Sequence, residues 1–120
     1  MTAHRVAKDL SKADLNILDP GASGTIVIDR YGGVCEMESA AAESRTLDDP
    51  LSGGLRATVR MRIDGGDITL TASGGLNVAG NTTATFADVG DQLDLISIET
   101  ATDGTYRWEI LTNTGSVALA

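Results

Sequence analysis

The chain has 120 residues, which is enough for one domain with a core of its own. Its 9 Lys and Arg stand against 17 Asp and Glu, and the resulting net charge of −8 argues against a general nucleic-acid binder, since phosphate backbones require clustered cations. The single Cys cannot form an internal disulfide, and one Cys with one His is too few for a zinc site. No apolar run is long enough to cross a bilayer and no secretory leader opens the chain, so we expect assembly in a cytoplasm.

Residues 1–18 predict an extended N-terminal arm, and residues 19–120 predict the folded body. The arm is basic at its start, because Arg5, Lys8 and Lys12 face a single acid within the first dozen residues. The body that follows is strongly acidic. This asymmetry has two interpretations, a solvated terminus or a segment that becomes ordered on a partner.

The body predicts eight to ten short strands, because β-branched residues and period-2 alternation recur between turns rich in Gly, Asn and Asp. The expected strands cover residues 25–29, 34–38, 44–47, 55–63, 67–71, 82–86, 92–98, 106–111 and 116–119. We expect Trp108 to enter the core. Regular short strands with frequent turns predict an all-β fold, either a β-sandwich or a jelly-roll-like barrel.

The stretch from Leu55 to Thr71 has the clearest strand pattern. Its apolar side is formed by Leu55, Ala57, Val59, Met61 and Ile63, and its polar side by Arg56, Thr58, Arg60 and Arg62. Asp64-Gly65-Gly66 then interrupts the alternation, which resumes through residues 67–71. A Gly-containing break between two alternating runs predicts a β-hairpin here. The break at residues 30–33 likewise predicts a return of the strand at residues 34–38.

The arginine row on this strand, Arg56, Arg60 and Arg62, has two interpretations. The guanidinium groups either pair with acids across a solvent-exposed face, where each pair contributes little, or dock an acidic neighbour. We therefore name the arm cations and the arginine row as candidate partner contacts: Arg5, Lys8, Lys12, Arg56, Arg60 and Arg62.

No catalytic constellation is visible in the sequence, so we expect no enzyme, no cofactor and no small-molecule substrate. Ser23 lies in a turn that lacks the second Gly of a nucleophile elbow, and the only His is His4. Cys35 is expected to be a buried core thiol. The acidic turns at residues 64–67 and 88–94 are ordinary for a β protein, although carboxylates in turns leave open a bound cation such as calcium. Paired acids for glycoside hydrolysis are not ruled out by residue type.

Several segments carry a family resemblance: Leu18-Asp19-Pro20-Gly21 with residues 25–30, residues 43–50, 53–55, 64–71 and 77–86, and Gly90-Asp91 with Tyr106-Arg107-Trp108. Across residues 18–120 the chain resembles small virion proteins of tailed bacteriophages, namely head decoration (cement) proteins or head-fibre proteins. The resemblance implies a β-sandwich or jelly-roll body, a trimer on the outer capsid surface and no catalysis. It offers no catalytic residues.

From this resemblance we expect a capsid decoration protein that is a homotrimer, binds the major capsid protein and stabilises the head. It would be located on the capsid exterior of the virion, with no nucleic-acid or membrane partner. The alternative is a receptor- or carbohydrate-binding head domain of a phage fibre, and a small hydrolase on a jelly-roll scaffold is a further competitor.

Overall fold

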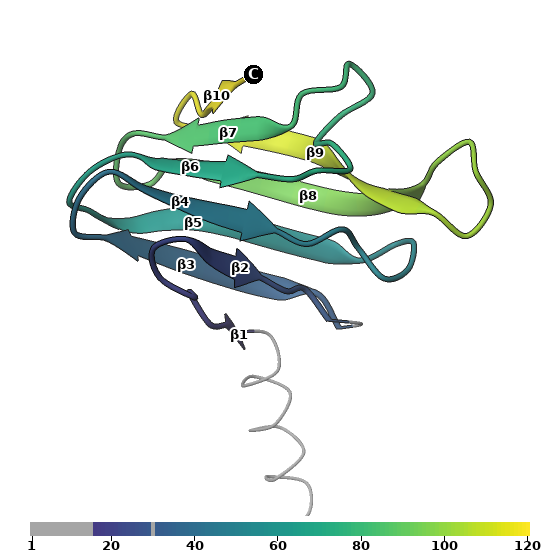
Figure 1. Ribbon diagram of the computed structural model, residues 1–120, viewed down its shortest axis with the longest axis horizontal. Coiled ribbons are helices and arrows are strands. Elements are labelled where there is room, and N and C mark those ends of the chain that lie inside the picture. Colours follow the sequence, from purple (N-terminus) through teal and green to yellow (C-terminus); the bar gives the residue numbers. More distant parts are fainter. Residues whose placement is uncertain (1–15, 30) are drawn as a thin grey trace, which may run out of the picture.

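The computed structural model describes residues 16–29 and 31–120, and these form ten strands in two five-stranded sheets packed face to face (Figure 1). Sheet A has the order β1-β3-β5-β8-β9, and sheet B has the order β10-β7-β6-β4-β2. The strands are β1 (Asn16–Ile17), β2 (Gly24–Ile26), β3 (Gly33–Ser39), β4 (Glu43–Leu47), β5 (Arg56–Asp64), β6 (Ile68–Thr71), β7 (Thr83–Phe86), β8 (Gln92–Glu99), β9 (Tyr106–Thr114) and β10 (Ala118–Leu119). The prediction of an all-β sandwich is confirmed.

The chain alternates between the sheets from β1 to β6, like a flattened coil. Consequently β1, β3 and β5 pair in parallel within sheet A, and β2, β4 and β6 pair in parallel within sheet B. The strands from β7 onwards add antiparallel pairs to both sheets. This parallel half distinguishes the fold from a jelly roll, in which the strands are antiparallel.

The predicted hairpin between residues 55 and 71 is wrong, because β5 lies in sheet A and β6 in sheet B. Each strand buries one apolar face, and the link between them carries the chain across the core so that these faces meet. Gly65 and Gly66 let the link pass close to the backbone of residues 39–42, because a Cβ on either glycine would collide with that backbone. The expected return at residues 34–38 is wrong for the same reason, because β2 and β3 also lie in different sheets.

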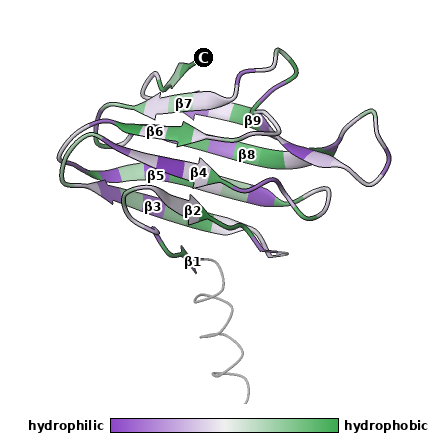
Figure 2. Cartoon of the chain, in the orientation of Figure 1, coloured by the Kyte–Doolittle hydropathy of each residue, from purple (hydrophilic) through white to green (hydrophobic). Residues whose placement is uncertain are grey.

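The core fills the space between the sheets, and hydrophobic and hydrophilic residues alternate along the strands that line it (Figure 2). Trp108 is fully buried as expected, and its indole Nε1 donates a hydrogen bond to the carbonyl oxygen of Asp48 at 2.8 Å. Cys35 is also buried, and its burial raises the pKa of the thiol to about 12. The expectation of a core thiol is therefore confirmed.

One position of the alternation in β5 does not follow the prediction. Ile63 was expected to point inward, yet 46% of its surface is exposed. A β-bulge shifts the register here, so that Met37 pairs with Met61 but Glu38 pairs with Ile63. The extra residue, Arg62, turns the following side chain out of the core.

Candidate interaction surface on sheet A

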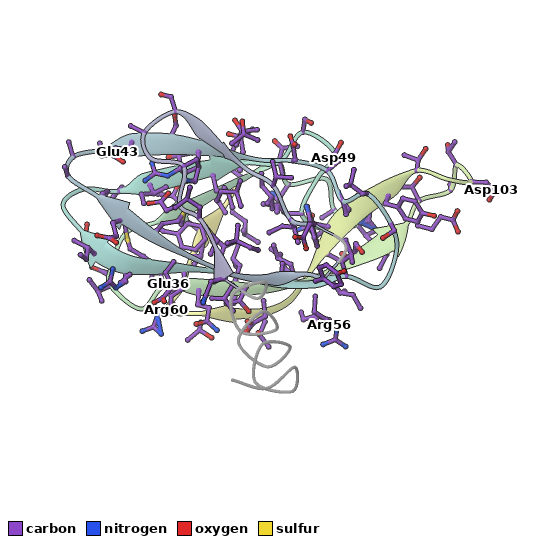
Figure 3. All side chains as sticks on the ribbon, turned by 90° about the horizontal axis from the view of Figure 1, so that it is seen from below. Glu36, Glu43, Asp49, Arg56, Arg60 and Asp103 are labelled. Carbon is purple, nitrogen blue, oxygen red and sulfur yellow. The ribbon has the colours of Figure 1, made fainter. Side chains whose placement is uncertain are left out.

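The arginine row lies on the outer face of β5, the central strand of sheet A. Arg56 and Arg60 alternate with the buried residues Ala57 and Val59, so their side chains point away from sheet B. Figure 3 shows Arg56, Arg60 and Glu36 on this same side of the molecule. The strand pattern thus places the guanidinium groups on one open face.

The three arginines differ in their partners. Arg62 forms an ion pair with Glu38, with 2.7 Å between Nη1 and Oε2, and both side chains are about half exposed. Arg60 stands between Glu36 and Gln92 in the strand register. Neither Arg60 nor Arg56 forms an ion pair within the described ranges. Arg62 therefore pairs with an acid across the exposed face, whereas the guanidinium of Arg56 is available to an acidic group of a neighbouring molecule.

Arg56 borders a groove of about 540 Å³ that crosses four strands of sheet A. The apolar side chains of Tyr31, Val34 and Leu111 line it, and these are 56%, 38% and 46% exposed, respectively. Because large apolar groups gathered at one open site commonly mark a contact surface, the groove is the most distinctive feature of this face.

Asp94 lies in the groove, but its carboxylate is already occupied. It accepts hydrogen bonds from Thr58 Oγ1 at 2.7 Å, from Gln92 Nε2 at 3.2 Å and from Thr112 Oγ1. The hydrogen bond from Thr112 is the main cause that lowers the pKa of Asp94 below its usual value, so the group stays ionised. These bonds link β5, β8 and β9, so the role of Asp94 is to hold the three strands together.

A second charged cluster, centred on Arg45, was missed by the sequence reasoning. The guanidinium is buried between the sheets, and all five of its N–H donors are used. Nε donates to Asp19 Oδ1 at 2.8 Å, Nη1 donates to Glu43 Oε1 at 2.9 Å and to the carbonyl of Ser44, and Nη2 donates to Asp19 Oδ2 at 3.2 Å and to the carbonyl of Glu38 at 2.9 Å. The alternation of β4 could have revealed it, because Arg45 shares a face with Leu47.

Asp19 extends this cluster to the edge of sheet A. Its Oδ2 also accepts the backbone N–H of Glu38 at 2.9 Å. Burial opposes ionisation of Asp19, but the hydrogen bonds from Arg45 and from the backbone outweigh it and lower its pKa. Burial likewise opposes the charge on Arg45, yet hydrogen bonds to the two acids raise its pKa. The cluster therefore holds the link between β1 and β2 against both sheets.

The arm cations Arg5, Lys8 and Lys12 lie outside the described residues. Asn16, the first residue that the structure describes, pairs with Val34 at the wall of the groove.

The acidic turn that ends at Asp91 is held together by one of its own carboxylates. Asp91 is buried, and its Oδ2 accepts the N–H groups of Ala87 and Asp88. Among residues 16–29 and 31–120, no group of three or more His, Cys, Asp or Glu side chains is placed to hold a metal ion.

The outer face of sheet B differs in chemistry from that of sheet A. Two cross-strand rows of hydroxyl side chains occupy its centre: Thr25, Thr46, Thr71 and Thr83 in one row, and Ser44, Thr69 and Thr85 in the other. Such Thr pairs stabilise neighbouring strands without adding charge. The arginine row and the apolar groove are thus features of sheet A.

Comparison with known proteins adds no family. No family model matches the chain, and no curated protein is significantly similar to it. Within the part of the chain that the structure describes, no helix has the length and apolar character needed to cross a membrane.

Proposed function

We propose that the chain is a structural virion protein, a capsid decoration protein that binds the outer capsid surface as a homotrimer and stabilises the head. Two lines support this: the resemblance of residues 18–120 to such proteins, and the position of the candidate contacts. The observation that carries the proposal is the open face of sheet A from which Arg56 and Arg60 project. The first described residue of the chain, Asn16, belongs to β1 of the same sheet.

The mechanism is mechanical. A trimer that sits where subunits of the major capsid protein meet presents three copies of the sheet A surface and three basic segments. Because the later contacts of such a body are effectively intramolecular, modest contacts together give strong attachment. The basic segment acts as a clamp on acidic loops of the capsid, with Arg56 as a second contact on the body.

Deletion of residues 1–12 tests the clamp. We expect occupancy on expanded capsids, measured by quantitative gel densitometry, to fall. A second variant keeps the full length of the chain and replaces only the three cations, by Arg5→Ala, Lys8→Ala and Lys12→Ala. Its occupancy should fall to a similar extent if the charge of the segment makes the contact. Unchanged occupancy in both variants rules the clamp out. Light scattering of the purified chain tests the trimer separately.

A receptor- or carbohydrate-binding head of a phage fibre is the second candidate. It is favoured by the exposure of Tyr31 at the groove, because sugar sites commonly stack a ring against an aromatic side chain. Binding of a defined glycan on an array, lost in Tyr31→Ala, would favour this function over decoration.

A further inference from the structure

We propose that the groove on sheet A is a docking site for an acidic segment of a partner protein, in which an apolar side chain stands next to a carboxylate. The identity of the partner as the capsid surface rests on the proposed function. The chemistry of the groove rests on the structure alone.

The apolar half of the recognition comes from the walls. Tyr31, Val34 and Leu111 come from the β2–β3 link, β3 and β9, and their exposed surface faces the groove rather than the core. A volume of about 540 Å³ lies within the range of sites that hold a compact ligand. Two aliphatic side chains of a partner segment would occupy part of this volume and remove the apolar surfaces from water.

The charged half comes from Arg56. Its guanidinium is exposed at the groove, and no carboxylate in the described part of the chain pairs with it. Asp94, the acid in the groove, already accepts bonds from Thr58, Gln92 and Thr112. The guanidinium of Arg56 therefore presents several N–H donors beside the apolar groove. This arrangement suits a carboxylate that accepts hydrogen bonds through both of its oxygens.

The chain's own N-terminal segment is a poor match for this groove. Residues 1–15 carry three cations, Arg5, Lys8 and Lys12, against two acids, Asp9 and Asp14, so the segment as a whole bears a net positive charge and does not complement Arg56. An acidic partner segment instead complements the guanidinium.

The test uses the ¹⁵N-labelled full chain and the peptide acetyl-Leu-Glu-Leu-Asp-amide. We expect the amide signals of Val34, Thr58 and Leu111 to shift on titration. The uncharged peptide acetyl-Leu-Gln-Leu-Asn-amide should bind about tenfold more weakly, because it lacks the charge-assisted hydrogen bonds. Arg56→Gln should weaken binding of the acidic peptide by a similar factor.

Arg62→Gln is the matched control, since Arg62 lies on the same strand but is already paired with Glu38. It should leave the affinity of the acidic peptide within about twofold. Equal binding of the two peptides, binding that survives Arg56→Gln, or an absence of shifts at the groove would overturn the inference. Nuclear Overhauser contacts between residues 1–15 and Leu111 in the free chain would also overturn it, because the occupant would then be the arm.

A capsid-binding assay with the same variants separates the two proposals. Loss of occupancy in Arg56→Gln but not in Arg62→Gln supports docking through the groove. Full occupancy in Arg56→Gln overturns the groove as the capsid contact and leaves decoration standing. If the wild-type chain fails to bind capsids but the acidic peptide binds at the groove, decoration is overturned and the chemistry proposed for the groove is supported.

Discussion

Replacing Arg45 with Met removes the cation that joins β4 to β3 and to the segment between β1 and β2. Met is apolar and similar in length, so much of the packing is kept while Asp19 and Glu43 lose their partner. Removing one partner of a buried ion pair typically costs about 3–5 kcal/mol. The two carboxylates retain 15% and 14% exposure and turn toward water more easily than fully buried acids. We therefore expect the lower end, about 3 kcal/mol.

Thermal and urea unfolding followed by the fluorescence of the buried Trp108 measure this loss. A change of about 3 kcal/mol corresponds to a fall in Tm of roughly 12 °C, because a domain of 120 residues has an entropy of unfolding of about 0.25 kcal/mol/K. Adding Asp19→Asn and Glu43→Gln to Arg45→Met removes the orphaned charges, so the combined variant should recover part of the stability. The control Arg62→Met, on an exposed ion pair, should change the free energy of unfolding by less than about 1 kcal/mol.

Two results would refute this reasoning. One is a loss below about 1 kcal/mol for Arg45→Met, which would mean that the buried cluster contributes no more than a surface pair. The other is a combined variant that is as unstable as Arg45→Met alone, because the cost would then come from lost packing rather than from unpaired carboxylates.

Two further predictions concern titration and reactivity. Because the folded-state pKa of Asp19 lies below its usual value of 3.8, the stability that its ionised form provides is present above that pH and is lost as the pH falls through the folded-state pKa. Denaturation measured from neutral to acidic pH should therefore show a steeper acid loss in the wild type than in Arg45→Met, and parallel pH profiles would contradict this. The thiol of Cys35, whose pKa burial raises to about 12, should react with Ellman's reagent only after denaturant is added; rapid reaction in the native chain would show that it is accessible.

The sequence predicted where strands lie better than which strands pair. Alternation in residues 55–63 reports that one face of β5 is buried, because inward side chains must be apolar whichever neighbour they meet. It carries no information on whether the next strand continues in the same sheet. The glycines at 65 and 66 suggested a tight hairpin turn, whereas their role is to let the crossing segment approach the backbone of residues 39–42.

The candidate site shows the same division. The outward direction of Arg56 and Arg60 followed from strand period alone, and the structure agrees. The groove could not be predicted in this way, because its lining residues come from β3, β5, β8 and β9 and meet only through the sheet order. Arg45 was overlooked because a charged residue on an inward position is rare, and its partner Asp19 is distant in sequence.

The central claim is that the chain is part of a virion and is attached to the outside of its capsid. Cryo-electron microscopy of mature tailed-phage particles whose genome encodes this chain, with mass spectrometry of the same preparation, tests this most directly. The account predicts threefold knobs on the outer capsid surface, each fitted by three copies of the two-sheet body with sheet A against the shell. Mature particles without the chain would contradict it.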